Sequence, residues 1–281
     1  MDQFTIGEIP DELLVTITAR LHSHSTALMR LTGRSGPEHD PLYIGSGTLV
    51  SIGHVDGILT AKHVADKLSG PFHLGLVMAR EGEEHRFMVD RKALSIFGIG
   101  QWKDEEFGPD LSFIVLSDWD DVGTIRASSS FHQLTNDRQE MIANPPDLDV
   151  GVWFLCGSPE KLVTQGPSDA GFREVMSLTD FCYAGGVDPG YEKDDFDYLD
   201  FPLENGDGSD LLSTYEGVSG GGLWQVTIRR SDDGDLIAGR YLYSGLVFWQ
   251  GARPDGVRFL RCHGRRSVYE MAYSTVIGKS A

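Results

Sequence analysis

The sequence predicts an all-β protein that ends in a helix. From about residue 27 onward, short apolar segments alternate with turn-forming stretches, which is the pattern of a β-barrel or a β-sandwich. The segment Asp-Asp-Gly-Asp at 232–235 lies between two such apolar segments and indicates a β-hairpin. Near the end of the chain, Ser-Val-Tyr-Glu at 267–270 has the form of a capping box and predicts a helix through residues 271–277.

The N-terminal part of the chain supports two interpretations. Residues 10–21 fit a helix that starts at Pro10 and carries Asp11 and Glu12 in its first turn. The same residues fit a strand in which alternate positions are apolar, so both interpretations remain open. In the second half of the chain, strands are expected at 174–178, 181–184, 198–203, 225–230 and 236–242.

A polar stretch divides the chain into two halves of similar size. Residues 126–149 contain three consecutive serines and end in Asn-Pro-Pro-Asp at 144–147. Such a composition is typical of a connection between two lobes. We therefore expect a first lobe within residues 1–135 and a second lobe within residues 136–281.

Length and composition limit the classes of protein that this chain can belong to. At 281 residues it can bury about three quarters of its unfolded surface, enough for one large domain or two small ones. Its three cysteines are widely spaced, odd in number and without a Cys-x-x-Cys pair, so neither a disulfide framework nor a zinc site is indicated. The segment 205–210 resembles part of a calcium-binding loop but lacks its length and its final glutamate, so no metal and no cofactor is predicted.

The charge of the chain argues against nucleic acid and membranes as partners. A net charge of −18 gives a surface that repels phosphate backbones and anionic lipids, and solubility is its simplest explanation. The N-terminus lacks a basic start, and its apolar run from Leu13 to Ala19 is interrupted by threonines and closed by Arg20. Because a signal peptide needs a basic start and a longer apolar stretch, we expect a cytoplasmic protein.

The most informative stretch is the glycine-rich segment 215–224, which contains Ser219. Glycine is used where the backbone bends tightly or approaches another group closely. A serine that attacks a carbonyl also needs backbone N–H groups to meet the negative charge that develops. The amides of Gly217, Val218 and Ser219 are therefore candidates for an oxyanion hole.

This motif alone is ambiguous, because Gly-x-Ser-x-Gly also occurs in the nucleophile elbow of α/β-hydrolases. In that fold the serine is followed by a helix, which the three glycines at 220–222 would disfavour. Two upstream segments supply partners for a different arrangement, since 58–64 contains His63 and 108–116 contains Asp110. The chain order histidine, aspartate, serine is that of chymotrypsin-type enzymes.

Three short motifs together resemble the chymotrypsin/trypsin-like serine peptidase family, in particular its intracellular bacterial members. They are Thr-Ala-x-His at 60–63, Asp-Leu-x-x-x-x-Leu at 110–116 and Gly-x-Ser-Gly-Gly at 217–221. The resemblance implies a fold of two six-stranded antiparallel β-barrels that face each other, followed by a C-terminal helix. It places His63 and Asp110 on the first barrel and Ser219 on the second.

The three motif residues have distinct chemical roles in this interpretation. A serine hydroxyl is a weak nucleophile unless a base takes its proton, so Ser219 is assigned as nucleophile and His63 as base. Asp110 precedes an apolar strand that would hold it rigidly, and it would orient and stabilise the imidazole. Among the other acids, those at 104–106 are expected in a charged loop, and Asp118, Asp120 and Asp121 are expected to be exposed after the strand. His54 is expected on a turn.

Two departures from the family pattern affect activation and specificity. Val218 stands where secreted relatives carry the aspartate that pairs with a new N-terminus, so we expect a site that is preformed or is ordered by a partner protein. The segment 245–251 resembles the strand that walls the substrate pocket, which makes Phe248, Trp249 and Gln250 candidate pocket residues. Ser213 takes the place of trypsin's pocket aspartate, so a preference for lysine or arginine is not supported.

The sequence therefore predicts a serine endopeptidase that cleaves a protein or peptide substrate through an acyl-enzyme. Two other functions remain open. One is a non-catalytic module of the same fold that binds a protein partner, and the other is an esterase that uses the same three residues.

Overall fold

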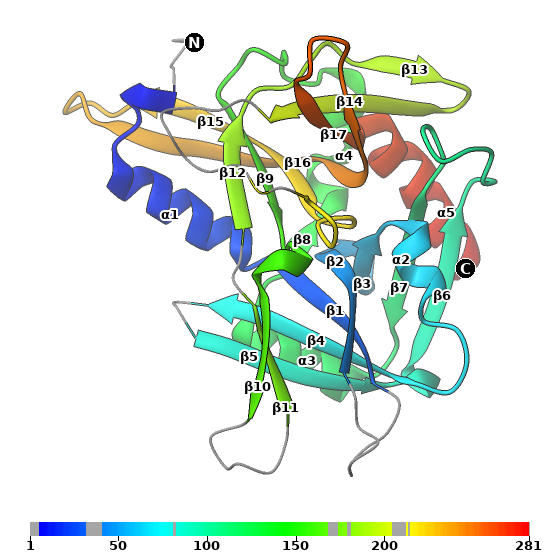
Figure 1. The fold of residues 1–281 in the computed structure, drawn as a ribbon. Helices are drawn as coiled ribbons and strands as arrows, with labels where there is room; N and C mark the ends of the chain where they lie inside the picture. The colour runs from blue at the N-terminus through cyan, green and yellow to red at the C-terminus, as the bar shows by residue number, and fades with distance from the viewer. Residues whose placement is uncertain are drawn as a thin grey trace.

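A computed structural model describes residues 6–31, 41–80, 83–167, 174–178, 181–203, 212 and 214–280 of the chain. Two largely antiparallel sheets dominate it, one built from the first half of the chain and one from the second (Figure 1). The strands of the first sheet are β1 Ser25–Leu31, β2 Pro41–Ile52, β3 Val55–Thr60, β4 His73–Arg80, β5 Glu83–Asp90, β6 Leu94–Ile99, β7 Leu111–Leu116 and β8 His132–Gln133. The strands of the second are β9 Val152–Gly157, β12 Phe181–Gly185, β13 Tyr191–Lys193, β14 Phe196–Leu203, β15 Gly222–Arg230, β16 Leu236–Ala252 and β17 Arg258–His263.

The two sheets have simple strand orders. The first runs β5-β4-β1-β2-β3-β7-β6, and β8 pairs with β2 in parallel. The second runs β12-β9-β15-β16-β17-β14-β13. A separate hairpin of β10 (Val163–Pro167) and β11 (Glu174–Leu178) connects β9 to β12 along the chain. The hairpin predicted around 232–235 is confirmed, because β15 and β16 pair on either side of that turn.

The prediction of six strands in each half was wrong in number. The sheets contain eight and seven strands, and two of the additional strands, β8 and β13, are only two and three residues long. Strands so short leave no alternating pattern in a sequence. Among the described residues, strand pairing in each sheet runs from one edge to the other, so neither sheet is seen to close into a barrel.

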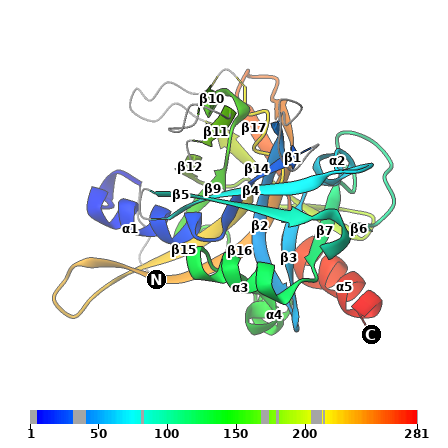
Figure 2. The ribbon, with the colours of Figure 1, turned by 90° about the horizontal axis from the view of Figure 1, so that it is seen from below.

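The helices lie around the sheets (Figures 1 and 2). The open choice at 10–21 is decided in favour of a helix, α1, which buries Ile17 and Leu21. The predicted connection at 126–149 is more regular than expected, because it contains the end of α3, all of β8 and α4. The helical elements are η1 Ile6–Glu8, α1 Asp11–His22, α2 Lys62–Asp66, η2 Arg91–Ala93, α3 Trp119–Ser128, α4 Leu134–Ala143, η3 Glu160–Leu162, the π-helical η4 Ser267–Ala272 and α5 Tyr273–Ser280.

The C-terminal helix is confirmed, but it is not capped as the sequence predicted. The carboxylate of Asp197, on β14, accepts the backbone N–H groups of Arg266 at 3.0 Å and Ser267 at 2.7 Å. The Ser267 hydroxyl donates to the same carboxylate at 2.7 Å. A side chain far away in sequence thus satisfies the Ser267 N–H, which the Glu270 side chain of the capping box was expected to satisfy.

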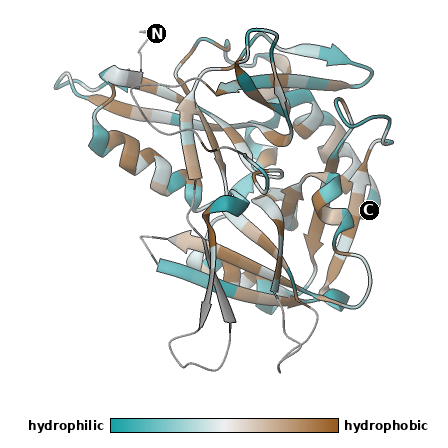
Figure 3. Cartoon of the chain, viewed as in Figure 1, coloured by the Kyte–Doolittle hydropathy of each residue, from teal (hydrophilic) through white to brown (hydrophobic). Residues whose placement is uncertain are grey.

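Hydrophobic residues concentrate along the central strands, whereas the edge strand β5 is mostly hydrophilic (Figure 3). Charged residues on an edge strand discourage pairing with other chains. One buried cluster draws residues from both sheets, including Leu28 and Phe113 from the first and Trp224 and Tyr243 from the second. The two halves therefore share a core. Within the described part of the chain, no helix combines the length and apolar character needed to cross a membrane.

Candidate active site

Strand pairing brings the predicted histidine and aspartate segments together. β3 and β7 are antiparallel neighbours, and Thr60 at the end of β3 lies opposite Ser112 at the start of β7. The chain enters α2 after β3, which places His63 in the first turn of that helix. Asp110 immediately precedes β7, at the same end of the strand pair.

The Asp110 carboxylate holds His63 through both of its oxygens. Oδ1 accepts the His63 backbone N–H at 2.8 Å, and Oδ2 lies 2.5 Å from the ring Nδ1. The Asp110 side chain is 3% exposed and the His63 side chain 40% exposed. A carboxylate in this position favours the tautomer that carries its proton on Nδ1, which leaves Nε2 as the proton acceptor.

A second histidine fixes Asp110 from the other sheet. The backbone N–H of Asp110 donates to Nε2 of His263, the last residue of β17, at 3.0 Å. His263 is fully buried, and desolvation lowers its pKa to about 3, so the ring is neutral at ordinary pH. It stacks on Phe248 with ring centroids 4.4 Å apart. Nothing in the sequence marks His263, because a histidine that ends a mostly buried strand has no signal that distinguishes it from ordinary core.

The loop that precedes Asp110 is also anchored to the second sheet. The Tyr198 hydroxyl donates to the carbonyl of Phe107 at 2.7 Å, and Arg261 Nη1 donates to the carbonyl of Glu106 at 3.2 Å. Desolvation raises the pKa of Tyr198 to about 12, which keeps its hydroxyl a donor. The acid of the first half is thus positioned by contacts with the second half.

The Ser219 loop, residues 214–221 before β15, requires glycine at two positions. Gly217 and Gly220 have φ angles of +89° and +92°, a region that side chains other than glycine rarely adopt. A Cβ on Gly220 would lie 1.9 Å from the carbonyl oxygen of Ser46, and one on Gly217 would lie 2.7 Å from the backbone nitrogen of Glu160. The loop can therefore pack this closely against its neighbours only with glycine at both positions.

Ser46, on β2 of the first sheet, is the main support of the Ser219 loop. Its backbone N–H donates to the carbonyl of Ser219 at 2.9 Å, and its hydroxyl donates to the carbonyl of Gly217 at 2.7 Å. The same hydroxyl oxygen accepts the backbone N–H of Ser158 at 2.8 Å. The Tyr43 hydroxyl lies 2.8 Å from the Gly217 carbonyl and also contacts the Ser158 carbonyl, and its one proton is shared between these two acceptors. Sequence analysis missed Ser46, because its role depends on a contact between the two sheets.

The predicted oxyanion hole needs one correction. The backbone N–H of Val218 donates to the carbonyl of Tyr215 at 3.1 Å, so this amide is used within the loop. Within the described residues, the N–H groups of Gly217 and Ser219 have no acceptor. These two amides, and not three, remain candidates for binding an oxyanion.

Hydrogen bonds of the neighbouring carbonyls fix the orientation of these two amides. The Glu216 carbonyl accepts the N–H of Glu160 at 2.8 Å, and the Val218 carbonyl accepts the N–H of Gly221 at 2.7 Å. In a trans peptide the N–H points away from the C=O of the same unit. The following N–H groups, those of Gly217 and Ser219, are therefore turned away from these bonds and held there.

The candidate residues meet in one cavity of about 470 Å³. His63, Asp110 and Ser219 line it. No hydrogen bond joins the Ser219 hydroxyl to the His63 ring in the described structure. Catalytic hydrogen bonds are often long before substrate binds, so this geometry alone does not exclude the pair. Ser213, the fourth predicted pocket residue, lies outside the described residues.

The other three predicted pocket residues, Phe248, Trp249 and Gln250, line the same cavity. They lie on β16 beyond Leu246, where its pairing with β15 ends. A β-bulge at Phe248 interrupts the pairing with β17 on the other side. The Gln250 side-chain oxygen accepts the backbone N–H of Tyr215 at 3.2 Å, which ties this strand to the loop before Ser219.

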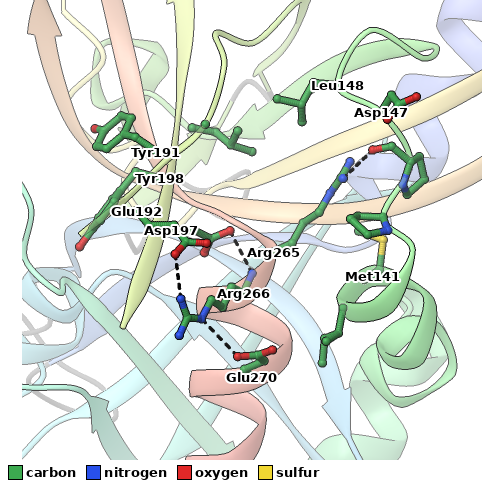
Figure 4. Close-up of a pocket in the computed structure, with 15 residues that line it drawn as sticks. Met141, Asp147, Leu148, Tyr191, Glu192, Asp197, Tyr198, Arg265, Arg266 and Glu270 are labelled. Atoms are coloured by element: carbon green, nitrogen blue, oxygen red, sulfur yellow. Dashed lines mark hydrogen bonds and ion pairs between the residues drawn. The ribbon is translucent and has the colours of Figure 1, made fainter. Parts of the chain in front are cut away.

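A larger cavity, of about 660 Å³, lies elsewhere, between α4, the β13–β14 hairpin and the start of the C-terminal helix (Figure 4). Its lining includes no serine, histidine or cysteine. Its arginines are engaged within the protein, since Arg266 pairs with Glu192 and Glu270, and Arg265 donates to the carbonyl of Pro146 at 2.7 Å. Size alone would select this cavity, but it lacks a nucleophile and base pair.

Comparisons with known proteins give little beyond this geometry. No protein-family model matches the sequence, and no curated protein matches it either. Among solved structures, the fold is similar to that of an HtrA-type protease, AlgW, determined with a decapeptide. The two are 12% identical, the match covers 94% of this chain and 67% of that one, and the TM-score is 0.45. A likeness this distant assigns neither a family nor an activity to the chain.

Proposed function

We propose that this protein is a serine endopeptidase of the trypsin-like type. The observation that carries the proposal is the clasp of His63 by both oxygens of a buried Asp110, in the same cavity as Ser219. A histidine held in this way is prepared to act as a base and then as an acid. Ser219 supplies a hydroxyl beside two oriented N–H groups, which suits attack on a carbonyl carbon.

The proposed reaction proceeds in two stages. Ser219 Oγ forms a bond to the scissile carbonyl carbon while His63 Nε2 takes the hydroxyl proton. The carbonyl oxygen becomes an oxyanion next to the N–H groups of Gly217 and Ser219. When the carbon–nitrogen bond breaks, His63 returns the proton to the leaving amine, and the acyl group remains on Ser219. Water then repeats the sequence, releases the acid and restores the serine.

Asp110 stabilises the imidazolium that forms in both stages. Because its carboxylate is buried, its interaction with the cation is weakly screened by solvent. The two halves of the chain contribute different residues, since His63 and Asp110 belong to the first half and Ser219 belongs to the second. The contacts of Ser46 and His263 hold the two parts in register.

A peptide is the proposed class of substrate. Val247 still bonds to Gly220 and Gly221 of the Ser219 loop, but beyond Val247 the side of β16 that faced β15 has no strand partner among the described residues, so an extended peptide can pair there. Glu105 and Glu216 are exposed in the lining of the cavity, which contains no lysine or arginine. This charge disfavours acidic side chains in the substrate and favours neutral or basic ones.

Labelling with a fluorophosphonate probe tests the proposal. The probe forms a bond to an activated serine oxygen and releases fluoride, so it reports the nucleophile without a known substrate. We expect the wild type to be labelled at Ser219, and Ser219→Ala and His63→Ala to be unlabelled. Ser95→Ala, which changes an exposed serine on β6, is the matched control and should label normally.

The outcome also separates the alternatives. Absence of labelling in the folded wild type, with candidate partner proteins added, would contradict the peptidase and favour a binding module. Labelling at Ser219 with cleavage of esters but not of peptides would favour an esterase. Labelling together with cleavage of a peptide library supports the endopeptidase.

A further inference from the structure

Two cysteines and a histidine that are far apart in the sequence meet in the second half of the molecule. Cys156 on β9 lies directly opposite Cys182 on β12, and their sulfur atoms are 3.0 Å apart. His22, the last residue of α1, reaches the same place. The two sulfurs and a ring nitrogen of His22 all lie within 4.8 Å of one another.

These side chains form a ligand set for a soft metal ion. Thiolates and imidazole together are characteristic ligands of zinc, and a tetrahedral zinc ion binds sulfur at about 2.3 Å and nitrogen at about 2.0 Å. Ligand atoms of such a site are therefore roughly 3.5 Å apart. The two sulfurs are closer than this, at 3.0 Å, and the histidine nitrogen lies within 4.8 Å of both, so the three atoms are already grouped on the scale of such a site. None of the three cysteines of the chain forms a disulfide.

Charge and access both suit a metal here. Two thiolates balance the charge of Zn²⁺, and neutral imidazole adds none, so the loaded site carries no net charge. This matters because Cys156 is buried, where an unbalanced charge is costly. His22 and Cys182 are half-buried, which gives an ion a path from solvent. Three protein ligands also leave the fourth tetrahedral position open to water.

We propose that His22, Cys156 and Cys182 form a binding site for one Zn²⁺ ion. The proposal differs from the expectation, drawn from the spacing of the cysteines, that the chain has no zinc site. It is independent of the proposed peptidase function, because none of its ligands lines the cavity that contains Ser219. A bound ion would join α1 to the edge of the second sheet, two elements that the sequence separates widely.

The site also adjoins the strand that follows the Ser219 loop. Cys156 is the pairing partner of Gly222, the first residue of β15. A Cβ on Gly221 would lie only 2.3 Å from the Cys156 carbonyl oxygen, so β9 and the loop are packed without space between them. Metal binding at Cys156 is therefore expected to reduce the mobility of this strand.

Titration with Zn²⁺ under reducing conditions, in competition with a chromogenic chelator, tests the proposal. We expect one equivalent to bind to the full chain. Losing a group that only supports a ligand weakens metal binding by about 10- to 100-fold, so losing a ligand itself should weaken it by more than about 100-fold. Cys182→Ser and His22→Gln each remove one half-buried ligand, and circular dichroism confirms that each variant is folded.

Two matched controls and a second metal sharpen the test. Cys262→Ser removes a buried thiol outside the cluster, where desolvation raises the thiol pKa, and His54→Gln removes an exposed histidine. Both are expected to bind Zn²⁺ like the wild type. Co²⁺ bound in place of Zn²⁺ should give a sulfur-to-cobalt charge-transfer band that weakens in Cys182→Ser and persists in Cys262→Ser.

Three outcomes would overturn the proposal. The first is absence of Zn²⁺ binding by the reduced protein. The second is binding that Cys182→Ser and His22→Gln leave unchanged, which would locate the ion elsewhere on the acidic surface. The third is a Co²⁺ complex without a charge-transfer band, because the thiolates would then not bind the metal. Oxidation of Cys156 and Cys182 to a disulfide by diamide would not rescue the proposal, since it requires only that the two thiols are close.

Discussion

The two histidines that contact Asp110 differ in almost every respect. The His63 side chain is 40% exposed, begins a helix in the first half and contacts the carboxylate. His263 is fully buried, ends a strand in the second half and accepts the backbone N–H. In the proposed mechanism the His63 ring exchanges protons with the substrate, whereas burial keeps the His263 ring neutral. The comparison separates residues that perform chemistry from residues that hold them in position.

The largest expected effect lies on the carboxylate between them. Asp110→Asn should slow fluorophosphonate labelling of Ser219 by about 10⁴-fold, because the amide no longer selects the productive tautomer of His63. The labelling rate constant, measured at fixed pH, checks this. Asp120→Asn, which changes an exposed acid on α3, is the control and should label at the wild-type rate. A loss smaller than tenfold in Asp110→Asn would remove Asp110 from the proposed triad.

A change on the buried side tests whether His263 positions Asp110. His263→Phe keeps an aromatic ring against Phe248 but removes the acceptor of the Asp110 N–H. Misplacement of a catalytic group by about 1 Å costs up to about 100-fold in rate, so we expect a loss of that order in the labelling rate. Leaving the buried N–H unpaired should also lower the free energy of unfolding by about 1–3 kcal/mol.

A conservative variant distinguishes positioning from general destabilisation. His263→Gln retains an oxygen that can accept the Asp110 N–H, and we expect it to restore most of the labelling rate. If His263→Gln and His263→Phe slow labelling equally while their unfolding free energies differ, the hydrogen bond has no role in positioning.

The same comparison predicts how stability depends on pH. Burial lowers the pKa of His263 to about 3 and that of His24 to about 4, against an ordinary value of 6.5. Between these values the unfolded chain binds protons that the folded chain does not. The free energy of unfolding should therefore fall as pH falls below about 6.5, by up to about 1.4 kcal/mol per pH unit for each histidine.

Urea unfolding at several pH values measures this slope. His263→Phe removes one of the two groups and should flatten the slope between pH 6.5 and about 4 relative to the wild type. An unchanged slope would mean that His263 does not stay neutral in the folded protein.

A smaller effect is expected at Ser46, which contacts the Ser219 loop as His263 contacts Asp110. Ser46→Ala removes the donor to the Gly217 carbonyl and the acceptor of the Ser158 N–H. The Tyr43 hydroxyl remains within hydrogen-bond distance of that carbonyl. Losing an oxyanion-hole donor slows a reaction by about 100-fold or more, and we expect Ser46→Ala to slow labelling by less than that. Ser95→Ala again provides the control, and a Ser46→Ala rate equal to the wild type would exclude this support role.

The smallest expected effect concerns the charge of the substrate. Glu216→Gln removes an exposed carboxylate from the cavity lining, and exposed ion pairs contribute only about 0.2–1 kcal/mol. Cleavage of peptides with lysine or arginine near the scissile bond should fall by about two- to fivefold relative to neutral peptides. A peptide library digested by wild type, Glu216→Gln and the edge-strand variant Glu83→Gln measures the difference. A general loss with every peptide would contradict an effect of charge.

The contrast between the two histidines also explains what the sequence could predict. His63, Asp110 and Ser219 each lie in a short segment with its own signature, and the structure brings all three to one cavity. The β15–β16 hairpin and the C-terminal helix were predictable for the same reason, since local residues specify them. The assignment of residues 1–135 and 136–281 to separate lobes stays a prediction, as do the roles of the three site residues.

The features that could not be predicted depend on contacts between distant segments. Two of these contacts join the two sheets, that of Ser46 with the Ser219 loop and that of His263 with Asp110. A third joins Asp197 on β14 to the start of the C-terminal helix. Nothing near these residues in the sequence marks their partners. The amide of Val218 was assigned wrongly because its direction depends on a turn closed by Tyr215. Short strands such as β8 and β13 form because neighbouring strands offer hydrogen bonds, and their own residues have no strand pattern.

The position of Ser46 has a consequence for the order in which the protein is made. Ribosomes release the N-terminal residues first, so β2 emerges before the loop at 217–221. Ser46 then exists without the loop that it supports, and the loop emerges only with the last quarter of the chain. If the proposed peptidase function holds, a nascent chain has no organised nucleophile until residues 217–221 have been synthesised, which would protect neighbouring nascent proteins from premature cleavage.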